Sequence, residues 1–302
     1  MNNRAIDTLV IATGDSFKNF KKILGSTALA TTLVATSFFA GSPSADAADL
    51  TVNNGQTIVL AGIDQANKDD NLIFGTATTG IVNTAATIMN VVNGSSANGN
   101  SAIAIAGTGS LIFSGNITST DQLVMTVGTG ADVFIAGNTT GGEPLKFVTA
   151  GAGGVTLNGA STQTLEGIFD SDSSLGGRLV LSGVGVKTFA EAVGGANAHG
   201  AITTSAGSTG IFASTTEGVI FNNLGTTTLT GAATITTLNN AGALTVTAAI
   251  DKVSGGLTTI NMTAQGSSVL FNATDAVDLD MIVKTATDSF GTLNFIDSAD
   301  AG

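Results

Sequence analysis

The clearest pattern in the chain is a five-residue phrase in which apolar positions alternate with other residues and are followed by a small residue or Asn and then Gly. The phrase occurs at 111–115, 133–137, 155–159 and 179–183, and it closes with Gly115, Gly137, Gly159 and Gly183. Alternation predicts short β-strands, and Gly or Asn after each strand supplies the positive φ of a sharp corner. The phrase recurs at a nearly constant interval of about 22 residues, and a period of this length predicts a stack of structural repeats.

A second set of apolar stretches follows nearly the same period. These stretches begin at Leu123, Leu145 and Leu165, so we expect at least two strands per repeat. Helical repeats would need longer stretches of 3.6-residue periodicity, whereas this region is rich in Thr, Val, Gly and Asn. The pattern therefore predicts an all-β fold, a right-handed parallel β-helix (a solenoid) with coils of about 20–24 residues.

Weaker patterns on either side of the repeats indicate the organisation of the chain. Residues 48–84 are interpreted as N-terminal capping coils, with Leu50–Gly62 as a first coil or a hairpin, because a stack needs a covered end. Regular coils begin near residue 85, and the β-helix is expected to continue to residue 302. The strand signal fades around Gly194–Gly200, which predicts an irregular break near residues 190–210.

Residues 1–47 have the pattern of an export signal. Lys18, Lys21 and Lys22 precede an apolar run at 23–40, and Ala45-Asp46-Ala47 forms a cleavage site of the A-x-A type. Ser and Thr residues dilute the apolar run, which favours a cleaved signal over a membrane anchor. The long stretch before Lys18 leaves two alternatives, an extended signal or a start further downstream.

The composition excludes some classes of partner. The net charge is −12, so binding to nucleic acid or anionic lipid through bulk charge is not expected. Cysteine is absent, which suits a repeat stack that is stabilised along its whole length rather than a small domain held by disulfides. Trp and Tyr are absent as well, a bias typical of long bacterial surface repeats.

An export signal followed by a cysteine-free, Gly-, Asn- and Thr-rich β-helix resembles the passenger of a type V autotransporter. Lys21-Lys22 before the apolar run, the opening at 50–55 (LTVNNG) and Leu-x-Phe-x-Gly phrases such as 111–115 resemble the rickettsial surface cell antigens of the outer membrane protein A and B group. The resemblance covers most of residues 20–302. It implies an exposed passenger that is carried outward by a C-terminal membrane barrel and adheres to a host-cell surface protein.

The chain departs from that family at its C-terminus, because no alternating ten-residue barrel strands occur there and the last residue is not aromatic. We therefore expect the barrel to be encoded elsewhere or lost, and the chain to be a fragment of something longer. The expected location is beyond the inner membrane, at the cell surface or outer membrane or outside the cell, or in the periplasm if the barrel is missing.

Candidate catalytic residues are few. His199 is the only histidine and would have to serve any Ser-His-Asp triad, but it lies among Gly and Ala, so we expect an exposed loop residue. Two carboxylates on one side of a strand could together cleave a polysaccharide. Candidates are Asp170 with Asp172, and a same-side pair among Asp275, Asp278 and Asp280. Without Trp or Tyr as a sugar platform, we interpret these carboxylates as solvated acidic loops.

Two further patterns resemble binding motifs. Residues 127–135 nearly match a calcium-binding nonapeptide, but Val127 replaces the first Gly and no tandem copy follows, so no metal site is expected. Thr-x-Thr pairs begin at Thr228, Thr234 and Thr245, and an aligned threonine ladder could order water as in ice-binding solenoids. The spacings between these pairs do not match one coil, so we interpret them as ordinary outward-facing strand residues.

Two functional classes remain, with a third behind them. The first is an adhesive or structural surface rod, and the second is a β-helical protein that binds or degrades polysaccharide, as phage tailspikes do. A surface-layer subunit would share the acidic, cysteine-free composition but would not require the repeat period. Since no acidic, basic and aromatic residues converge in the sequence, we favour the first class, with no catalytic, cofactor-binding or metal-binding residues and no nucleic-acid partner.

Overall fold

The computed structural model describes residues 101–247 apart from 107–108, 121, 143–144 and 174–175. It also describes residues 33–34, 50–52, 57–59, 65, 71–74, 79–82, 85–88, 90–93, 250–251, 258–273, 281–285 and 291–297. The chain divides into two units, residues 1–31 and 32–302, and all described residues belong to the second unit. Their regular secondary structure is entirely β-strand. Within the described ranges no helix has the length and apolar character needed to cross a membrane.

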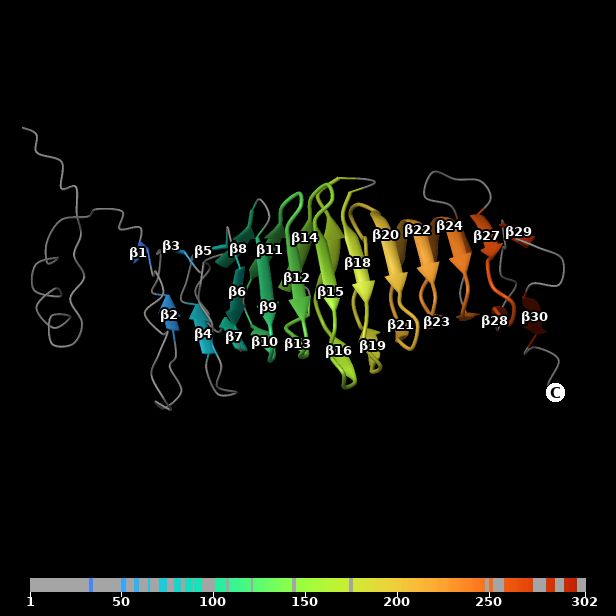
Figure 1. Ribbon diagram of the computed structural model, residues 1–302, viewed down its shortest axis with the longest axis horizontal. Helices are drawn as coiled ribbons and strands as arrows, with labels where there is room; N and C mark the ends of the chain where they lie inside the picture. Colours follow the sequence, from blue (N-terminus) through green and yellow to red (C-terminus); the bar gives the residue numbers. More distant parts are fainter. Residues whose placement is uncertain are drawn as a thin grey trace, which may run out of the picture. The chain divides into compact units, whose positions relative to one another are not determined.

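The strands form three parallel sheets, whose members lie side by side along the second unit (Figure 1). Sheet 1 contains, in spatial order, β1 (Leu33–Val34), β3 (Thr57–Val59), β5 (Thr79–Val82), β8 (Ser101–Ile105), β11 (Leu123–Val127), β14 (Leu145–Thr149) and β17 (Ile168–Ser171). Sheet 2 contains β2 (Leu50–Val52), β4 (Asn71–Phe74), β7 (Asn90–Asn93), β10 (Ile117–Ser119), β13 (Thr139–Thr140), β16 (Gln163–Leu165), β19 (Val186–Phe189), β21 (Thr209–Phe212), β23 (Thr226–Leu229), β25 (Ala243–Val246), β28 (Ser268–Ala273) and β30 (Thr292–Asp297). Sheet 3 contains β6 (Ala85–Ile88), β9 (Ser110–Phe113), β12 (Asp132–Ile135), β15 (Gly154–Leu157), β18 (Arg178–Leu181), β20 (His199–Thr204), β22 (Thr216–Asn223), β24 (Ala233–Asn240), β27 (Thr258–Met262) and β29 (Met281–Thr285), and β26 (Ile250–Asp251) pairs with β24.

Each strand pairs in parallel with the strand one coil away. Leu123 faces Ser101 on one side and Leu145 on the other, each one repeat period distant along the chain. The four strands of the repeated phrase likewise follow one another in sheet 3, where Val133 pairs with Leu111 and Val155. The predicted parallel β-helix is therefore confirmed.

The prediction that apolar stretches beginning at Leu123, Leu145 and Leu165 form a second series of equivalent strands is only partly correct. Leu123 and Leu145 are register partners in sheet 1, but Leu165 belongs to sheet 2, where it pairs with Thr139 and Phe189. The sheet 1 neighbour of β14 begins instead at Ile168, which pairs with Lys146. A regular coil thus contains three strands, one in each sheet.

The coil becomes shorter in one part of the stack. Asn222 and Asn239 are register partners and lie only 17 positions apart, and Thr228 pairs with Thr245 at the same interval. Val193 bridges Phe169 of sheet 1 to Thr216 of β22, so the first half of β22 continues sheet 1 while its second half pairs with β20 of sheet 3. One eight-residue strand therefore takes the place of a sheet 1 strand and a sheet 3 strand, so the coil has one corner fewer.

Strand pairing continues through two segments, one predicted to be irregular and one predicted to form capping coils. In the region predicted to break, near residues 190–210, β20 pairs with both β18 and β22. In the N-terminal segment, β2 pairs in parallel with β4, and β3 pairs in parallel with β5. The hairpin alternative for Leu50–Gly62 is therefore wrong. Of the predicted signal segment, Leu33–Val34 is described, as a strand parallel to β3.

Inward-facing side chains of successive coils stack on one another and form the core. The largest stack is aromatic, with centroid distances of 4.6, 5.3, 4.8 and 5.6 Å along the series Phe147, Phe169, Phe189, Phe212 and Phe221. Aliphatic columns continue the core on both sides, and almost all of these side chains are buried. Because each of the three middle rings contacts two others, the stack joins successive coils and stabilises them together.

The glycines that close the repeated phrase do not all serve the predicted purpose. Gly183 has a φ of 81°, as expected for a sharp corner, but Gly137 and Gly159 do not have positive φ. A Cβ atom on Gly137 would instead lie 2.1 Å from the carbonyl oxygen of Gly115, and one on Gly159 would lie 2.4 Å from the oxygen of Ala136. At these corners glycine allows the backbones of adjacent coils to approach closely.

We expect Thr216→Val to stabilise the protein. The Thr216 side chain points into the core on β22, and its hydroxyl has no hydrogen-bond partner among the residues that the structure describes. An unpaired buried hydroxyl costs about 1–3 kcal/mol, and Val has nearly the same shape. The free energy of unfolding in urea should rise by about 1–2 kcal/mol. Thr227→Val is the matched control, because the Thr227 hydroxyl bonds to Asn223 and Thr204, and it should destabilise the protein. Equal effects of the two changes would contradict this account.

Candidate functional site

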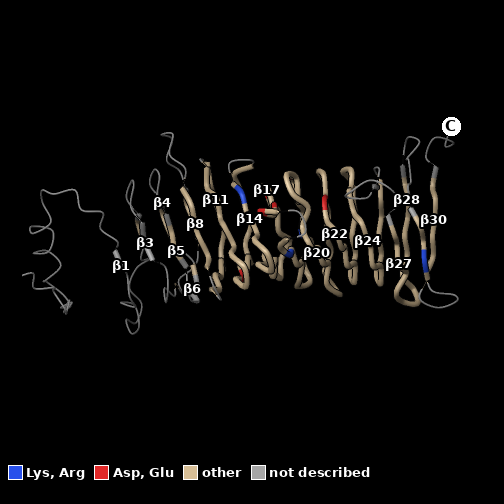
Figure 2. The backbone as a smooth tube through the Cα atoms, turned by 90° about the horizontal axis from the view of Figure 1, so that it is seen from above, with Lys and Arg blue, Asp and Glu red and all other residues tan. Residues whose placement is uncertain are grey.

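Among the described residues, the Lys, Arg, Asp and Glu positions lie mostly in the central coils, around β14, β17 and β22 (Figure 2). Two ion pairs occur there, one between Lys146 and Asp170 and one between Arg178 and Asp132. This group also includes the only histidine, His199, which lies beside β17. The central coils are therefore the first candidate for a site.

Asp170 is at the centre of the group and is not the solvated loop carboxylate that the sequence predicted. By strand alternation it lies on the outer side of β17, opposite the inward-facing Phe169, yet it is only 1% exposed. Its Oδ1 accepts hydrogen bonds from the backbone N–H groups of Ser171 and Asn197, and its Oδ2 lies 2.9 Å from Nζ of Lys146. Asn197 belongs to the segment that covers the Asp170 carboxylate. The same segment therefore buries the carboxylate and donates a hydrogen bond to it.

These contacts set the ionisation of Asp170. Burial acts to raise its pKa, but the hydrogen bonds from Lys146, Asn197 and Ser171 and the charge of Lys146 outweigh burial and hold the pKa below its ordinary value. Asp172, by contrast, is exposed and lies beyond the end of β17, where it accepts a hydrogen bond from Ser173. The two carboxylates therefore do not form the predicted same-side pair.

Glu217 lies two coils further along the same outer face. The bridges of Val193 to Phe169 and Thr216 place Gly194 between Asp170 and Glu217. Burial raises the pKa of Glu217, and the negative charge of Asp170 raises it further. Both oxygens of Asp170 are bonded within the protein, to Lys146 and to the backbone of Ser171 and Asn197.

His199 is buried, with 1% of its surface exposed, so the expectation of an exposed loop residue is wrong. Its Nε2 lies 3.2 Å from the carbonyl oxygen of Phe169, and its Nδ1 lies 3.4 Å from the hydroxyl of Thr149. Since a carbonyl can only accept, Nε2 carries the proton and Nδ1 is the acceptor. The imidazole thus joins three coils from the inside, and both of its partners among the described residues are buried.

We expect stability to fall as the pH is lowered through the range in which free histidine titrates. Burial lowers the pKa of His199 below 6.5, although the Phe169 hydrogen bond and the charge of Asp170 oppose this. Between the two pKa values the unfolded state binds more protons than the folded state, so the contribution of neutral His199 is complete above pH 6.5 and is lost below it. Urea unfolding at pH 7.5 and 5.5 should show this loss.

The variant His199→Gln provides the control for that pH dependence. It retains a donor near the Phe169 carbonyl but cannot titrate, so the difference between pH 7.5 and 5.5 should shrink. Glu217, whose raised pKa adds stability as the pH falls, acts in the opposite direction in both proteins and cancels in the comparison. An unchanged difference in His199→Gln would show that His199 is not the group responsible.

A second set of polar side chains points into the interior along one corner of the stack. Gln163 and Lys187 are register partners on β16 and β19, and both are buried. Nζ of Lys187 donates to the carbonyl oxygens of Gly159, Gly183 and Gly185 at 2.9, 3.3 and 2.9 Å. Burial lowers the pKa of Lys187. Its ammonium group satisfies corner carbonyls of two coils, which is a structural role.

Asparagine side chains continue this bonding between coils. Inside the stack, Nδ2 of Asn223 donates to Oδ1 of Asn240 at 2.7 Å. At another corner, the side-chain oxygens of Asn90, Asn116 and Asn138 accept from backbone N–H groups of the following coils. The Asn residues after the strand phrases gave a sequence signal for corners, but not for these ladders, because each bond joins residues of different coils that are far apart in the sequence.

The remaining sequence candidates do not converge. Asp132 of the near-calcium motif forms an ion pair with Arg178. Among the described residues no cluster of three or more His, Asp or Glu side chains could hold a metal ion. Asp275, Asp278 and Asp280 lie outside the described residues. Thr228 and Thr245 are register partners, so the prediction that the threonine spacings do not match a coil is wrong, although both face outward as expected.

Comparisons of the chain with models of known protein families, with curated proteins and with solved structures give no match. The function is therefore inferred from the fold and from the contacts of its side chains. The fold is a parallel β-helix, and in its central coils Lys146 pairs with Asp170 and Arg178 pairs with Asp132.

Proposed function

We propose that the chain is the β-helical passenger of a bacterial surface or secreted protein of the autotransporter type, and that it acts as an adhesive or structural scaffold. The observation that carries this proposal is the repetition of uncharged polar side chains on the outward faces at intervals of one coil. Thr164 and Thr188 are register partners on sheet 2, as are Thr228 and Thr245, and Asn222 and Asn239 are partners on sheet 3.

A repeated outward face suits adhesion because it offers many equivalent weak contacts rather than one deep pocket. Adjacent strands lie about 4.8 Å apart, so a partner that spans several coils meets similar groups at a regular spacing. Multiple weak contacts raise the overall affinity when they are made together. We propose a protein of the host-cell surface as the partner, and export across the inner membrane through residues 1–47.

A binding assay on cells tests this function. Purified full-length chain carrying a fluorescent label should bind cultured animal cells saturably, and trypsin treatment of the cells should abolish the binding. Chain unfolded in urea and diluted immediately before use is the control for nonspecific adhesion. Binding that survives trypsin would contradict a protein receptor, and failure of the native chain to bind would contradict the adhesive role.

The alternative is a protein that binds or degrades polysaccharide. It is favoured by one observation only, the row of amide side chains on sheet 3, because amides are common hydrogen-bond partners of sugar hydroxyls. Release of new reducing ends from a bacterial or host polysaccharide by the purified chain would establish this alternative and displace the scaffold.

A further inference from the structure

A column of outward-facing amides runs along the C-terminal part of sheet 3. Register pairing places Thr203, Asn222, Asn239, Asn261 and Lys284 at equivalent positions of successive coils. Nδ2 of Asn261 donates to Oδ1 of Asn239 at 2.9 Å, and Nδ2 of Asn239 donates to Oδ1 of Asn222 at 2.9 Å. Nδ2 of Asn222 lies 3.4 Å from the hydroxyl of Thr203. We call this column the amide ladder.

The amide ladder has a direction. Every amide nitrogen points toward the preceding coil, so the ladder ends in Oδ1 of Asn261, which faces the coil that carries Lys284. A lysine ammonium group can only donate, and this agrees with an acceptor at that end of the ladder. Each amide keeps a second N–H group outside the ladder, so the column presents donors to a ligand at intervals of about 4.8 Å.

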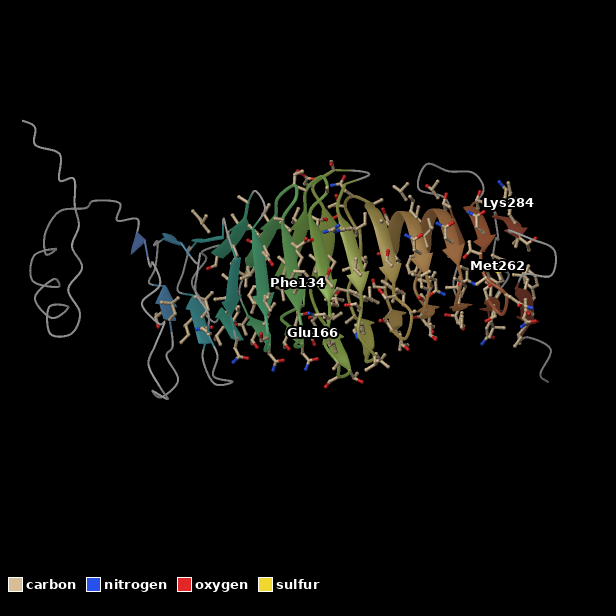
Figure 3. All side chains as sticks on the ribbon, viewed as in Figure 1. Phe134, Glu166, Met262 and Lys284 are labelled. Carbon is tan, nitrogen blue, oxygen red and sulfur yellow. The ribbon has the colours of Figure 1, made fainter. Side chains whose placement is uncertain are left out.

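A cavity of about 320 Å³ lies at this end of the amide ladder. Its lining residues are Asn239, Asn261, Met262, Thr263, Lys284 and Thr285, of which Met262 is buried and Thr263, Lys284 and Thr285 are exposed. Met262 and Lys284 lie in the two C-terminal coils of sheet 3 (Figure 3). The volume is at the lower end of the range for small-molecule sites and fits one sugar unit.

Lys284 differs from the other cations that the structure describes. Lys146 and Arg178 form ion pairs with carboxylates, and Lys187 is bonded to three carbonyl oxygens. Lys284 is exposed, and within the described ranges it has no carboxylate partner. Because the chain has a net charge of −12, most of its surface repels anions. An exposed lysine that lines a cavity is a place where an anion is attracted instead.

We propose that this cavity binds an acidic sugar unit, with its carboxylate on the ammonium group of Lys284 and its hydroxyl groups on the amides of Asn261 and Asn239. A single lysine is a point charge and matches one carboxylate, whereas phosphate is usually held by several donors or by the planar fork of arginine. Further sugar units of a chain continue along the amide ladder toward Asn222.

The site does not depend on the proposed adhesive function. Adhesion to a host-cell protein can fail while the cavity binds an acidic sugar, and the reverse also holds. The two experiments use different ligands, cells in one and a free monosaccharide in the other, so each result is assigned to one proposal.

Saturation-transfer NMR of the full chain with sodium glucuronate and with glucose tests the site. Glucuronate should bind at millimolar concentration, and glucose should bind at least about tenfold more weakly because it has no carboxylate. Lys284→Gln should weaken glucuronate binding by about tenfold, and Lys284→Arg should restore most of it. Arg178→Gln, which removes a cation from the same sheet, is the matched control and should leave glucuronate binding unchanged.

Folding of each variant is checked by its urea midpoint, which should stay at that of the parent chain because Lys284 is exposed. Three results would overturn the proposal: no glucuronate binding by the parent chain, equal binding of glucose and glucuronate, or equal loss in Lys284→Gln and Arg178→Gln. The last result would indicate attraction by overall charge rather than a site.

Discussion

Replacing Phe189 by Ala is expected to lower the free energy of unfolding by about 3–5 kcal/mol, the usual cost of removing a buried aromatic ring. Phe189 is 1% exposed and sits between two rings of the core. Its centroid is 5.3 Å from that of Phe169 and 4.8 Å from that of Phe212. The change leaves a cavity in the middle of the aromatic stack, and both neighbouring coils lose contacts. Equilibrium unfolding in urea, followed by circular dichroism, measures the loss.

Phe134→Ala is the matched control for this prediction. Phe134 belongs to β12 but alternates with the buried Val133 and Ile135, so its ring lies on the outer face (Figure 3). Its removal should cost no more than about 1.5 kcal/mol, because a half-exposed ring leaves no cavity. Similar losses for Phe134→Ala and Phe189→Ala would contradict the assignment of inward and outward faces.

Gly137→Ala is expected to destabilise the protein by about 3 kcal/mol or more, at the upper end of the cost of overpacking. The added Cβ would lie 2.1 Å from the carbonyl oxygen of Gly115 and 2.9 Å from the backbone nitrogen of Asn116. Both atoms belong to the backbone of the preceding coil and cannot rotate away. The coils must separate locally, which weakens their hydrogen bonds. The same urea experiment measures the effect.

Gly207→Ala separates this steric cost from the cost of backbone conformation. Gly207 has a φ of 79°, and a Cβ there would meet nothing within 4 Å. Only the left-handed conformation is then penalised, by about 1–2 kcal/mol. A loss for Gly137→Ala no larger than that for Gly207→Ala would show that close approach between coils is not what Gly137 provides.

The sequence predicted those parts of the fold that repeat strongly. The phrases around Leu111, Val133, Val155 and Leu179 lie in register on sheet 3, because each combines alternating apolar residues with a small residue and Gly at a nearly constant interval. Sheet 2 was not recognised as a separate sheet in this region, because several of its strands are short and polar. β13 consists of Thr139 and Thr140 alone, which is too short for alternation to be recognised.

The shorter coils were missed for a different reason. The threonine pairs begin at Thr228, Thr234 and Thr245, and the two intervals between them together make up the length of one short coil. Thr234 belongs to β24 in a different sheet from Thr228 and Thr245, so the two intervals measure steps around a coil. Only the pairing of strands distinguishes a step around the coil from a step along the stack.

The buried polar residues could not be predicted from local sequence. Gly and Ala flank His199, which suggests a loop, but its burial and both of its partners come from residues 30 and 50 positions away. Asp170 is likewise covered by the segment at Asn197, 27 positions further along the chain. In a stacked fold, the environment of a side chain is set by neighbouring coils, which no local pattern reports.

The most direct test of the account is a series of distances between spin labels along one outward column of sheet 2. Register pairing places the column at Thr164, Thr188, Ile211, Thr228, Thr245, Leu270 and Asn294. The chain has no cysteine, so pairs of introduced cysteines can be labelled specifically. Double electron–electron resonance then measures the distance from a label at 164 to a label at each of the last three positions.

The parallel β-helix predicts that these distances increase by about 4.8 Å for each coil, to about 19 Å for position 245, about 24 Å for position 270 and about 29 Å for position 294. The two steps between these three distances should be equal. Distances that do not increase by about one strand spacing for each coil along the series would contradict the stacked-coil structure.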